Sequence, residues 1–230
     1  MKTLGLIGGT TWISTMDYYS LINRRTNELL GGLSSAKLLL YSVNFEEFKP
    51  PVDPKDWDEL TAKFIAIAKK LEGNGVDAIV FCANTPHLIA DKVQDNIDIP
   101  LIHIAQAAAT EIASRNIKRV ALLGTRVTME QSFFKDKLAK NGIETLIPEA
   151  GDRHFMHAAI FNEMGKGIFS PETKKRFIQI INGLVAQGAK GVILGCTEFP
   201  HLIKSDDCSV PLFDTTVMHA DAAVHFLITD

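Results

Sequence analysis

The chain has 230 residues, enough for one large α/β unit or for two lobes of about a hundred residues each. Apolar residues make up 46% and charged residues 22%, as in a globular protein with a packed core. With 24 basic and 27 acidic residues the formal charge is −3, so we expect no nucleic-acid partner. No apolar run approaches the roughly 18 to 20 residues of a membrane span. Three cysteines are too few for a disulfide framework. These features predict a soluble, cytoplasmic protein with no membrane partner.

Short apolar runs that predict buried parallel strands alternate with longer amphipathic stretches along the chain. The expected strands are Thr3–Ile7, Lys37–Val43, Ala78–Cys82, Arg119–Leu123, Gly142–Ile147, Gly191–Leu194 and Val210–Phe213. The clearest helices are Ser14–Leu30, Asp58–Leu71 and Lys174–Ala186, and a glycine follows each of them within two residues. The repeated β-α-β order predicts an α/β fold with doubly wound parallel sheets.

An internal repeat divides this pattern into two similar halves. Residues 75–89 and 188–203 both pass from a glycine through a buried strand into a polar turn, and then into Pro-His-Leu-Ile. The repeat predicts two related lobes whose strand ends meet at a cleft. The alternative is coincidence, because any α/β protein has several apolar strands that end in small residues.

Four turns follow predicted strands at the end of the sheet where open α/β folds bind their ligands. They are rich in Gly, Thr and Asn and poor in fixed charge: Gly8–Thr11, Cys82–Thr85, Gly124–Thr128 and Gly195–Glu198. Backbone N–H groups, hydroxyls and helix N-termini of this kind suit small carboxylates or phosphates. The sequence therefore predicts a small-molecule site at these turns.

Nucleotide and metal motifs do not match this sequence. The segment Gly5–Thr10 resembles a glycine-rich turn but lacks the G-x-G-x-x-G spacing and the phosphate-loop lysine. The seven histidines are dispersed, with no CxxC, HExxH or HxH spacing. We expect no cofactor and no metal. His87 and His201 each follow a turn proline, where capping or packing is the usual role.

Cys196 is the strongest candidate for chemistry. It comes just after a buried strand, at the start of the next predicted helix, where the positive helix end lowers the pKa of a thiol. A cysteine at such a place can be inert, but the Gly-Cys-Thr-Glu setting in the second copy of the repeat favours catalysis. Cys208 lies in a polar loop, and we interpret it as incidental.

At these residues the chain resembles the aspartate/glutamate racemase family, the amino-acid racemases that work without pyridoxal phosphate. The resemblance runs nearly end to end. It is carried by Gly8-Gly9, Tyr18-Tyr19, Ile22-Asn23, Asn84-Thr85-Pro86-His87, Leu123-Gly124-Thr125, Thr128-Met129, Gly195-Cys196-Thr197-Glu198 and Phe213-Asp214-Thr215. It implies two similar α/β lobes, residues 1–100 with 208–230 and residues 101–207, the first completed by the C-terminal helix. It also implies an active site in the cleft between them, no cofactor, and a homodimer.

The resemblance implies a reaction that needs two acid–base groups. Racemisation removes the α-proton from one face of the amino acid and returns a proton to the other, so one thiolate and one thiol flank Cα. The carbanion-like transition state also needs hydrogen bonds to the α-carboxylate. Cys196 is the implied first group, and the substrate is an aspartate- or glutamate-like amino acid. The implied substrate-binding residues are Thr10, Ala83, Asn84, Thr85, Thr125, Thr128, Thr197 and Glu198.

The first half departs from the family pattern. The family's first cysteine stands immediately before Asn-Thr, where this chain has Ala83, and Cys82 is one residue earlier. An offset of 114 residues aligns Cys82 with Cys196, whereas an offset of 113 aligns Ala83 with Cys196. One residue of slip turns a strand side chain to the opposite face, so Cys82 packs against a helix unless the turn is bulged. Cys82 and Thr85 are the candidates for the second base.

A second carboxylate on the substrate would need a cation. Lys49 and Lys166 are the main candidates, and Arg24 and Arg126 are further candidates. The alternative for each of them is a solvated surface charge. Glu198 either orients the substrate ammonium or caps a helix.

Two further residues near the predicted turns have open roles. Trp12 either covers the cleft or packs, and Asp214 is a candidate to hold the segment between the lobes.

Three functions stay open at this point. The first is an amino-acid racemase. The second is a single-cysteine enzyme of the wider superfamily, a decarboxylase or isomerase of a small carboxylic acid, which needs a proton donor on one face only. The third is a homologue that binds a small acid without catalysis.

Overall fold

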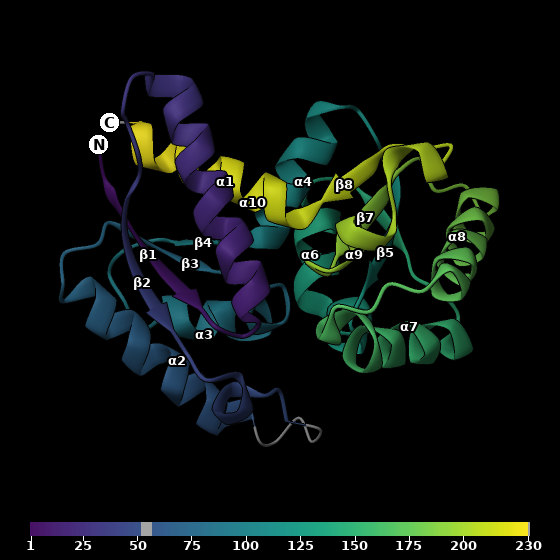
Figure 1. Cartoon of the computed structure of the whole chain (residues 1–230), viewed down its shortest axis with the longest axis horizontal. Coiled ribbons are helices and arrows are strands. Elements are labelled where there is room, and N and C mark those ends of the chain that lie inside the picture. The colour runs from purple at the N-terminus through teal and green to yellow at the C-terminus, as the bar shows by residue number, and fades with distance from the viewer. Residues whose placement is uncertain (52–56, 230) are drawn as a thin grey trace. The chain divides into compact units, whose positions relative to one another are not determined.

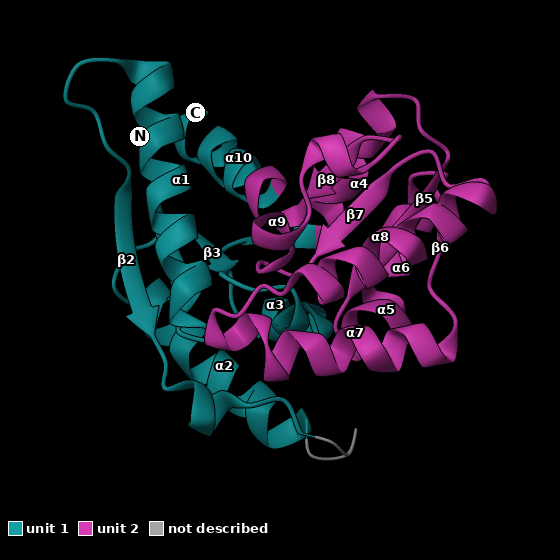
Figure 2. Ribbon diagram, turned by 45° about the vertical axis from the view of Figure 1, so that its right-hand side comes forward, with its two compact units in different colours: residues 1–104, 219–230 teal, residues 105–218 magenta. Residues whose placement is uncertain are grey.

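The computed structural model describes residues 1–51 and 57–229. Strands and helices alternate along the chain (Figure 1). In chain order the elements are β1 Thr3–Gly8, α1 Trp12–Leu30, β2 Lys37–Ser42, η1 Phe45–Phe48, α2 Trp57–Glu72, β3 Ala78–Phe81, η3 Thr85–Ile89, α3 Ala90–Gln94, β4 Leu101–Ile102, α4 Ile104–Ser114, β5 Arg119–Gly124, α5 Arg126–Glu130, α6 Ser132–Lys140, β6 Glu144–Leu146, α7 Ala150–Asn162, η4 Met164–Lys166, α8 Pro171–Ala186, β7 Val192–Gly195, α9 Phe199–Leu202, η5 Ser205–Asp207, β8 Leu212–Asp214 and α10 Thr215–Ile228. They form two compact units, residues 1–104 with 219–230 and residues 105–218 (Figure 2).

Unit 1 holds a parallel four-stranded sheet in the order β2-β1-β3-β4. Helices α1 and α10 pack against one face, where Tyr18 and Val224 are fully buried beside Val80. Helix α2 packs against the other face, with the Phe64 ring 5.1 Å from the Phe81 ring. Strands β1 and β3 are therefore buried on both faces, as the sequence predicts, whereas the edge strand β2 is largely exposed, contrary to that prediction.

Unit 2 repeats this arrangement with the order β6-β5-β7-β8, again all parallel. Its largest apolar cluster joins β5 and β7 to α7, α8 and α9, with Phe177 and Phe199 fully buried. Two doubly wound sheets of the same strand order confirm the predicted fold class. The segment of α10 from His219 onward belongs to unit 1.

The strands at the ends of the two sheets differ from the expectation. The sequence analysis did not predict β4, which is two residues long and follows Pro100. Strand β8 pairs with β7 through Val192 and Leu212, so it extends the second sheet. Residues 208–218 consequently lie in unit 2 and not with the first lobe, and residues 101–104 lie in unit 1.

Local signals explain where α1 begins and why its turn is tight. The Thr11 hydroxyl accepts a hydrogen bond from the Ser14 N–H at 3.3 Å, so the helix begins at Trp12, two residues before the predicted start. Gly9 has φ +89°, and a Cβ there would lie 2.1 Å from the Val43 carbonyl oxygen. Only glycine fits this position, which brings the β1 turn against the segment that follows β2.

Candidate functional site

The sheet registers decide which residue of unit 1 corresponds to Cys196. In unit 1 Ile7 lies beside Phe81, and in unit 2 Leu123 lies beside Leu194. Both β1 and β5 end at the next residue, a glycine. Phe81 and Leu194 are thus equivalent, an offset of 113 residues, which makes Ala83 the structural counterpart of Cys196.

Cys82 lies on the opposite face of its sheet from the position that the family pattern requires. Its side chain is fully buried with Val80 among apolar residues of α1 and α10. Burial raises the pKa of the Cys82 thiol, so it stays protonated. This packing was expected, because Cys82 is one residue before the family's cysteine position and its side chain therefore points to the opposite face of the strand.

The β1 turn of unit 1 is built from hydroxyls. The Thr15 hydroxyl accepts from the Gly9 N–H at 2.8 Å, and the Ser14 hydroxyl donates to the Cys82 carbonyl at 2.9 Å. The hydroxyl oxygen of Thr10 is buried and has no hydrogen-bond partner among the described residues. Buried polar atoms are nearly always paired, so this hydroxyl is available to a bound molecule.

The side chain of His87 holds the neighbouring β3 turn through two backbone carbonyl groups. Its Nδ1 lies 2.9 Å from the Ala83 carbonyl oxygen and 3.3 Å from that of Asn84. A carbonyl oxygen only accepts, so Nδ1 carries a proton, and the lowered pKa of the buried ring keeps it neutral. Burial, reinforced by His103 and His219, lowers the pKa of His87 well below its usual value.

His219 is locked in one tautomer beside His87, with 5.2 Å between the ring centroids. Its Nε2 donates to the Ile102 carbonyl at 2.7 Å, and its Nδ1 accepts from the Tyr18 hydroxyl at 2.7 Å. Burial lowers the pKa of His219 to about 4. The packing role expected for His87 is confirmed, and His219 is a member of the cluster that sequence reasoning missed.

The β7 turn of unit 2 carries a different set of groups. Cys196 and Glu198 are both more than nine-tenths buried. The Cys196 thiol donates to the Glu198 carboxylate, with 2.9 Å from Sγ to Oε2, and the Thr197 hydroxyl donates to the same oxygen at 2.9 Å. The Glu198 side chain makes no capping bond to α9, so the capping alternative is wrong.

This environment keeps Cys196 in its thiol form. Burial raises the pKa of the Cys196 thiol well above its usual value, and the charge and hydrogen bond of Glu198 raise it further. The backbone N–H groups of Glu198 and Thr197 act in the opposite direction. The expectation of a helix end that lowers this pKa is therefore outweighed by burial and by one carboxylate.

The β5 turn adjoins the β7 turn, because Gly124 and Gly195 are partners in the sheet. The Thr125 hydroxyl accepts from the Thr128 N–H at 3.2 Å, and the two hydroxyl oxygens lie 3.1 Å apart. A Cβ on Gly195 would lie 2.5 Å from the Leu123 carbonyl oxygen, so glycine is required there. Unit 2 thus gathers these predicted threonines beside Cys196, as unit 1 gathers Thr10 and Asn84.

The predicted cations differ in their environments. Lys49 and Lys166 are exposed, Lys49 just after η1 and Lys166 at the end of η4. Arg126 pairs with Glu130 at 3.2 Å, and Arg153 pairs with the same carboxylate at 3.0 Å. Arg126 is therefore already engaged within unit 2.

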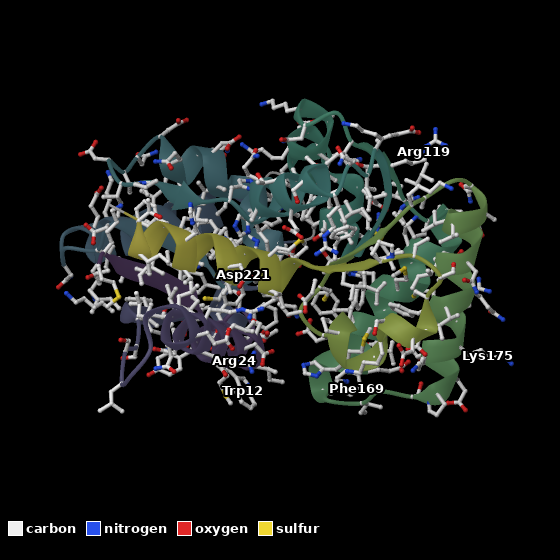
Figure 3. The ribbon with its side chains drawn as sticks, turned by 90° about the horizontal axis from the view of Figure 1, so that it is seen from above. Trp12, Arg24, Arg119, Phe169, Lys175 and Asp221 are labelled. Atoms are coloured by element: carbon white, nitrogen blue, oxygen red, sulfur yellow. The ribbon has the colours of Figure 1, made fainter. Side chains whose placement is uncertain are left out.

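Three other predicted residues are exposed or occupied. Trp12 is exposed and not packed, and it projects with Arg24 from the surface of α1 (Figure 3). The Asp214 carboxylate accepts from the Thr216 N–H at 2.8 Å at the start of α10.

The segment between α7 and α8 also reaches the β7 turn of unit 2. The Phe169 ring contacts that of His201, with 5.7 Å between the centroids. His201 is exposed, so its packing is limited to this contact at the surface.

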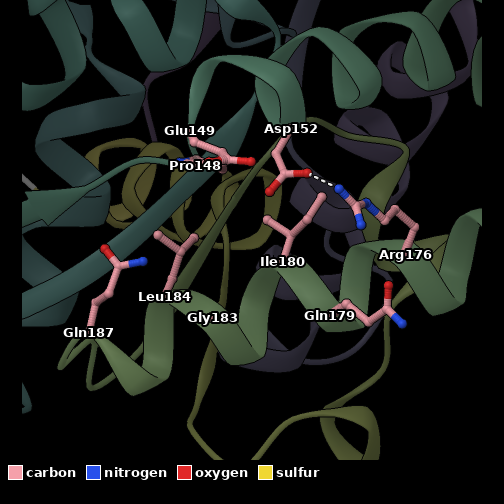
Figure 4. Close-up of a pocket in the computed structure, with 9 residues that line it drawn as sticks. All are labelled: Pro148, Glu149, Asp152, Arg176, Gln179, Ile180, Gly183, Leu184 and Gln187. Atoms are coloured by element: carbon pink, nitrogen blue, oxygen red, sulfur yellow. Dashed lines mark hydrogen bonds and ion pairs between the residues drawn. The ribbon is translucent and has the colours of Figure 1, made fainter.

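A surface pocket of unit 2 lies elsewhere, between the start of α7 and the second half of α8 (Figure 4). It is crossed by the ion pair of Asp152 with Arg176. It contains none of the predicted site residues.

In residues 1–51 and 57–229 no three His, Cys, Asp or Glu side chains are grouped so that they could hold a metal ion. In the same residues no helix is both long and apolar enough to cross a membrane.

Comparison with known proteins points in one direction. The family description Asp/Glu/hydantoin racemase matches residues 7–223. A protein of Yersinia pestis provisionally named an Asp/Glu racemase is 42% identical, with a TM-score of 0.94 over the full length of both chains. An aspartate racemase homologue from Pyrococcus horikoshii is 36% identical, with a TM-score of 0.86 and full coverage of both. The broad specificity amino-acid racemase RacX of Bacillus subtilis is 26% identical over 174 residues, 74% of each chain.

Proposed function

The chain belongs to the Asp/Glu/hydantoin racemase family, and on that premise we propose that it racemises acidic amino acids with Cys196 as one acid–base group. The observation that carries this proposal is the buried contact of the Cys196 thiol with the Glu198 carboxylate. A thiol at the carboxyl end of a strand, beside a group that controls its proton, is equipped for proton transfer at Cα.

Glu198 gives the thiol a switch that substrate can operate. Without substrate its negative charge helps to hold the pKa of Cys196 high. A substrate ammonium placed against Glu198 would offset that charge, so the pKa of the thiol would fall and thiolate would form next to Cα. The thiolate then accepts the α-proton, and in the reverse direction the thiol donates it to the carbanion.

The α-carboxylate needs hydrogen-bond donors, and both units offer them. The buried Thr10 hydroxyl lacks a partner, and the Thr125 and Thr128 hydroxyls lie beside the Cys196 turn. Such donors stabilise the charge that spreads onto the carboxylate as the α-proton leaves. We assign the second carboxylate of the substrate to Lys49 or Lys166, whose side chains are exposed.

Racemisation also needs a second acid–base group, on the other face of Cα. Ala83 stands where unit 1 would carry a second thiol, and Cys82 lies in the core. Thr85 lies two residues after Ala83 and is half-buried. We propose its hydroxyl as the second acid–base group, acting directly or through a water. Asn84 and Thr197 complete the two turns.

A one-sided reaction is the second candidate, and Ala83 favours it. An enzyme with a single thiol can protonate one face of a carbanion, as in the decarboxylation of a malonate-like acid. It would exchange the α-proton of an amino acid without inverting the centre.

We also propose a cytoplasmic homodimer. The three cysteines are free thiols, which suits a reducing compartment, and the resemblance that implies a dimer extends along nearly the whole chain.

The test is a panel of L- and D-amino acids, each incubated with the protein and analysed by chiral chromatography. We expect inversion of aspartate or glutamate from either enantiomer, lost in Cys196→Ala. Turnover of a malonate-like acid without any inversion would replace the proposed function with the one-sided reaction. No turnover of any amino acid or malonate would contradict both.

A further inference from the structure

Helix α1 presents an apolar stripe to solvent. Trp12, Met16 and Tyr19 are 65%, 60% and 55% exposed, and they follow one another at intervals of four and three residues. This spacing places them on one side of the helix. The helix already buries another stripe, which includes Tyr18 and Ile22, so the exposed stripe is additional to the one that holds the fold.

The exposed stripe lies on the side of α1 that is turned toward β2. Asn23, one helical turn beyond Tyr19, accepts a hydrogen bond from the Ala36 N–H at 3.1 Å, immediately before β2 begins. Figure 2 shows α1 and β2 side by side. Leu30 at the end of α1 is also exposed on this side.

Strand β2 is the edge of its sheet and is unusually apolar for such a position. It pairs with β1 on one side only, and Leu39 and Leu40 are 37% and 47% exposed. Edge strands are normally protected by charges, prolines or bulges. The sequence of β2, Lys-Leu-Leu-Leu-Tyr-Ser, has one charge, at Lys37, and no proline.

We propose that the α1–β2 surface, formed by Trp12, Met16, Tyr19, Leu30 and Leu40, binds a second copy of this chain through antiparallel pairing of the two β2 strands. Leu39 lies on the opposite face of β2, with Tyr41. Together the side chains of the surface expose on the order of 600 Å², a large part of the ~800 Å² that each partner buries in a stable interface. Monomeric proteins seldom expose apolar patches larger than a few hundred Å².

The strand is compatible with pairing to itself. Two identical antiparallel strands are related by a twofold axis. When this axis is perpendicular to the sheet, each face of one copy continues as the same face of the other. Such an axis passes beside one residue of the strand, here Leu39 or Leu40. An axis at Leu39 sets Leu38 opposite Leu40, and either axis sets Lys37 opposite an uncharged residue, Tyr41 or Val43. Like charges therefore do not meet, and apolar side chains of the two copies face one another.

The experiment measures mass in solution by light scattering and sedimentation over a range of protein concentrations. We expect the natural chain to be a dimer. Leu40→Lys on the strand and Met16→Lys on the helix should each weaken dimerisation at least 100-fold, with an unchanged circular dichroism spectrum. Ile168→Lys, at an exposed apolar position of unit 2, is the matched control and should remain dimeric.

Each other outcome overturns the proposal. A natural chain that is monomeric at high concentration would show that this surface does not bind a second copy. A dimer that survives both Leu40→Lys and Met16→Lys must use another surface. This inference rests on the homodimer of the proposed function, but the variants touch none of the proposed site residues. Inversion of aspartate or glutamate therefore tests the activity separately, and the interface can fail while the racemase proposal stands.

Discussion

The turns after β3 and β7 have the same place in equivalent sheets, and each leads into Pro-His-Leu-Ile, yet they have different chemistry. At the β7 turn a buried thiol faces a carboxylate at 2.9 Å. At the β3 turn the equivalent residue is Ala83, and the nearest thiol packs in the core. Neutral histidines hold the β3 turn from beneath, whereas the histidine of the β7 turn, His201, is exposed.

Two turns with the same groups would contribute equally to proton transfer, whereas these two turns differ in what each can contribute. In the proposed reaction the β7 turn supplies the thiol and carboxylate for proton transfer, whereas the β3 turn has the small residue Ala83 at the equivalent position. Four changes test this difference, the first two mainly through turnover and the last two mainly through stability, each pair from the larger expected effect to the smaller.

Glu198→Gln removes the charge that distinguishes the β7 turn. We expect the pKa of Cys196 to fall, because burial remains but the negative neighbour is gone. Turnover should fall about 100-fold, within the range that general acid–base groups contribute. The rate of Cys196 alkylation against pH measures the first effect, and Cys196→Ala gives the background. A thiol that titrates at the same pH as in the natural chain would contradict the role of Glu198.

Ala83→Cys makes the two turns alike. A thiol at this position restores the second acid–base group of the family pattern, so inversion should increase relative to proton exchange by about 10-fold, near the lower end of what an added acid–base group contributes. Ala83→Ser is the matched control, since it adds a polar atom of much weaker acidity. Equal ratios in Ala83→Cys and the natural chain would mean that the natural chain already serves both faces.

His219→Gln tests the neutral histidines beneath the β3 turn. The pKa of His219 is lower in the folded chain, about 4, than its ordinary value of 6.5. The unfolded chain therefore binds more protons between these values, so stability is complete above pH 6.5 and is lost as pH falls through 4. This is worth about 3 kcal/mol.

Chemical denaturation at pH 7 and pH 4.5 measures the loss, which we expect to be smaller in His219→Gln. The exposed His225 on the same helix provides the control, and His225→Gln should keep the full loss. An equal loss in all three proteins would rule out His219 as its source.

Cys82→Ala should have the smallest effect. It removes one buried sulfur from the core, at a cost of about 1 kcal/mol in the free energy of unfolding, and leaves turnover within twofold. Denaturation and the chiral assay measure both quantities. A large loss of turnover without a loss of stability would return Cys82 to the site.

Much of the candidate site could be predicted from the sequence, because the motifs that indicate it are short and continuous in the chain. The repeated glycine, apolar strand and Pro-His-Leu-Ile give the two turns, and a slip of one residue predicts the core position of Cys82. The choice between offsets of 114 and 113 needed the register of β1 against β3, which pairs residues more than seventy positions apart.

The missed features depend on distant parts of the chain. His87 is buried beside the rings of His103 and His219, which come from other parts of the chain, whereas His201 is exposed and contacts the surface ring of Phe169. Strand β8 is apolar enough for either sheet, and only its pairing with β7 decides between them. Glu198 is two residues from Cys196, but their contact depends on how the turn orients both side chains.

The most direct test of the account is α-proton exchange in D₂O, followed by proton NMR on L- and D-aspartate separately. The natural chain should exchange the α-proton of at least one enantiomer, and Cys196→Ala should exchange neither. Exchange by Cys196→Ala at the natural rate would contradict the assignment of proton transfer to the β7 turn.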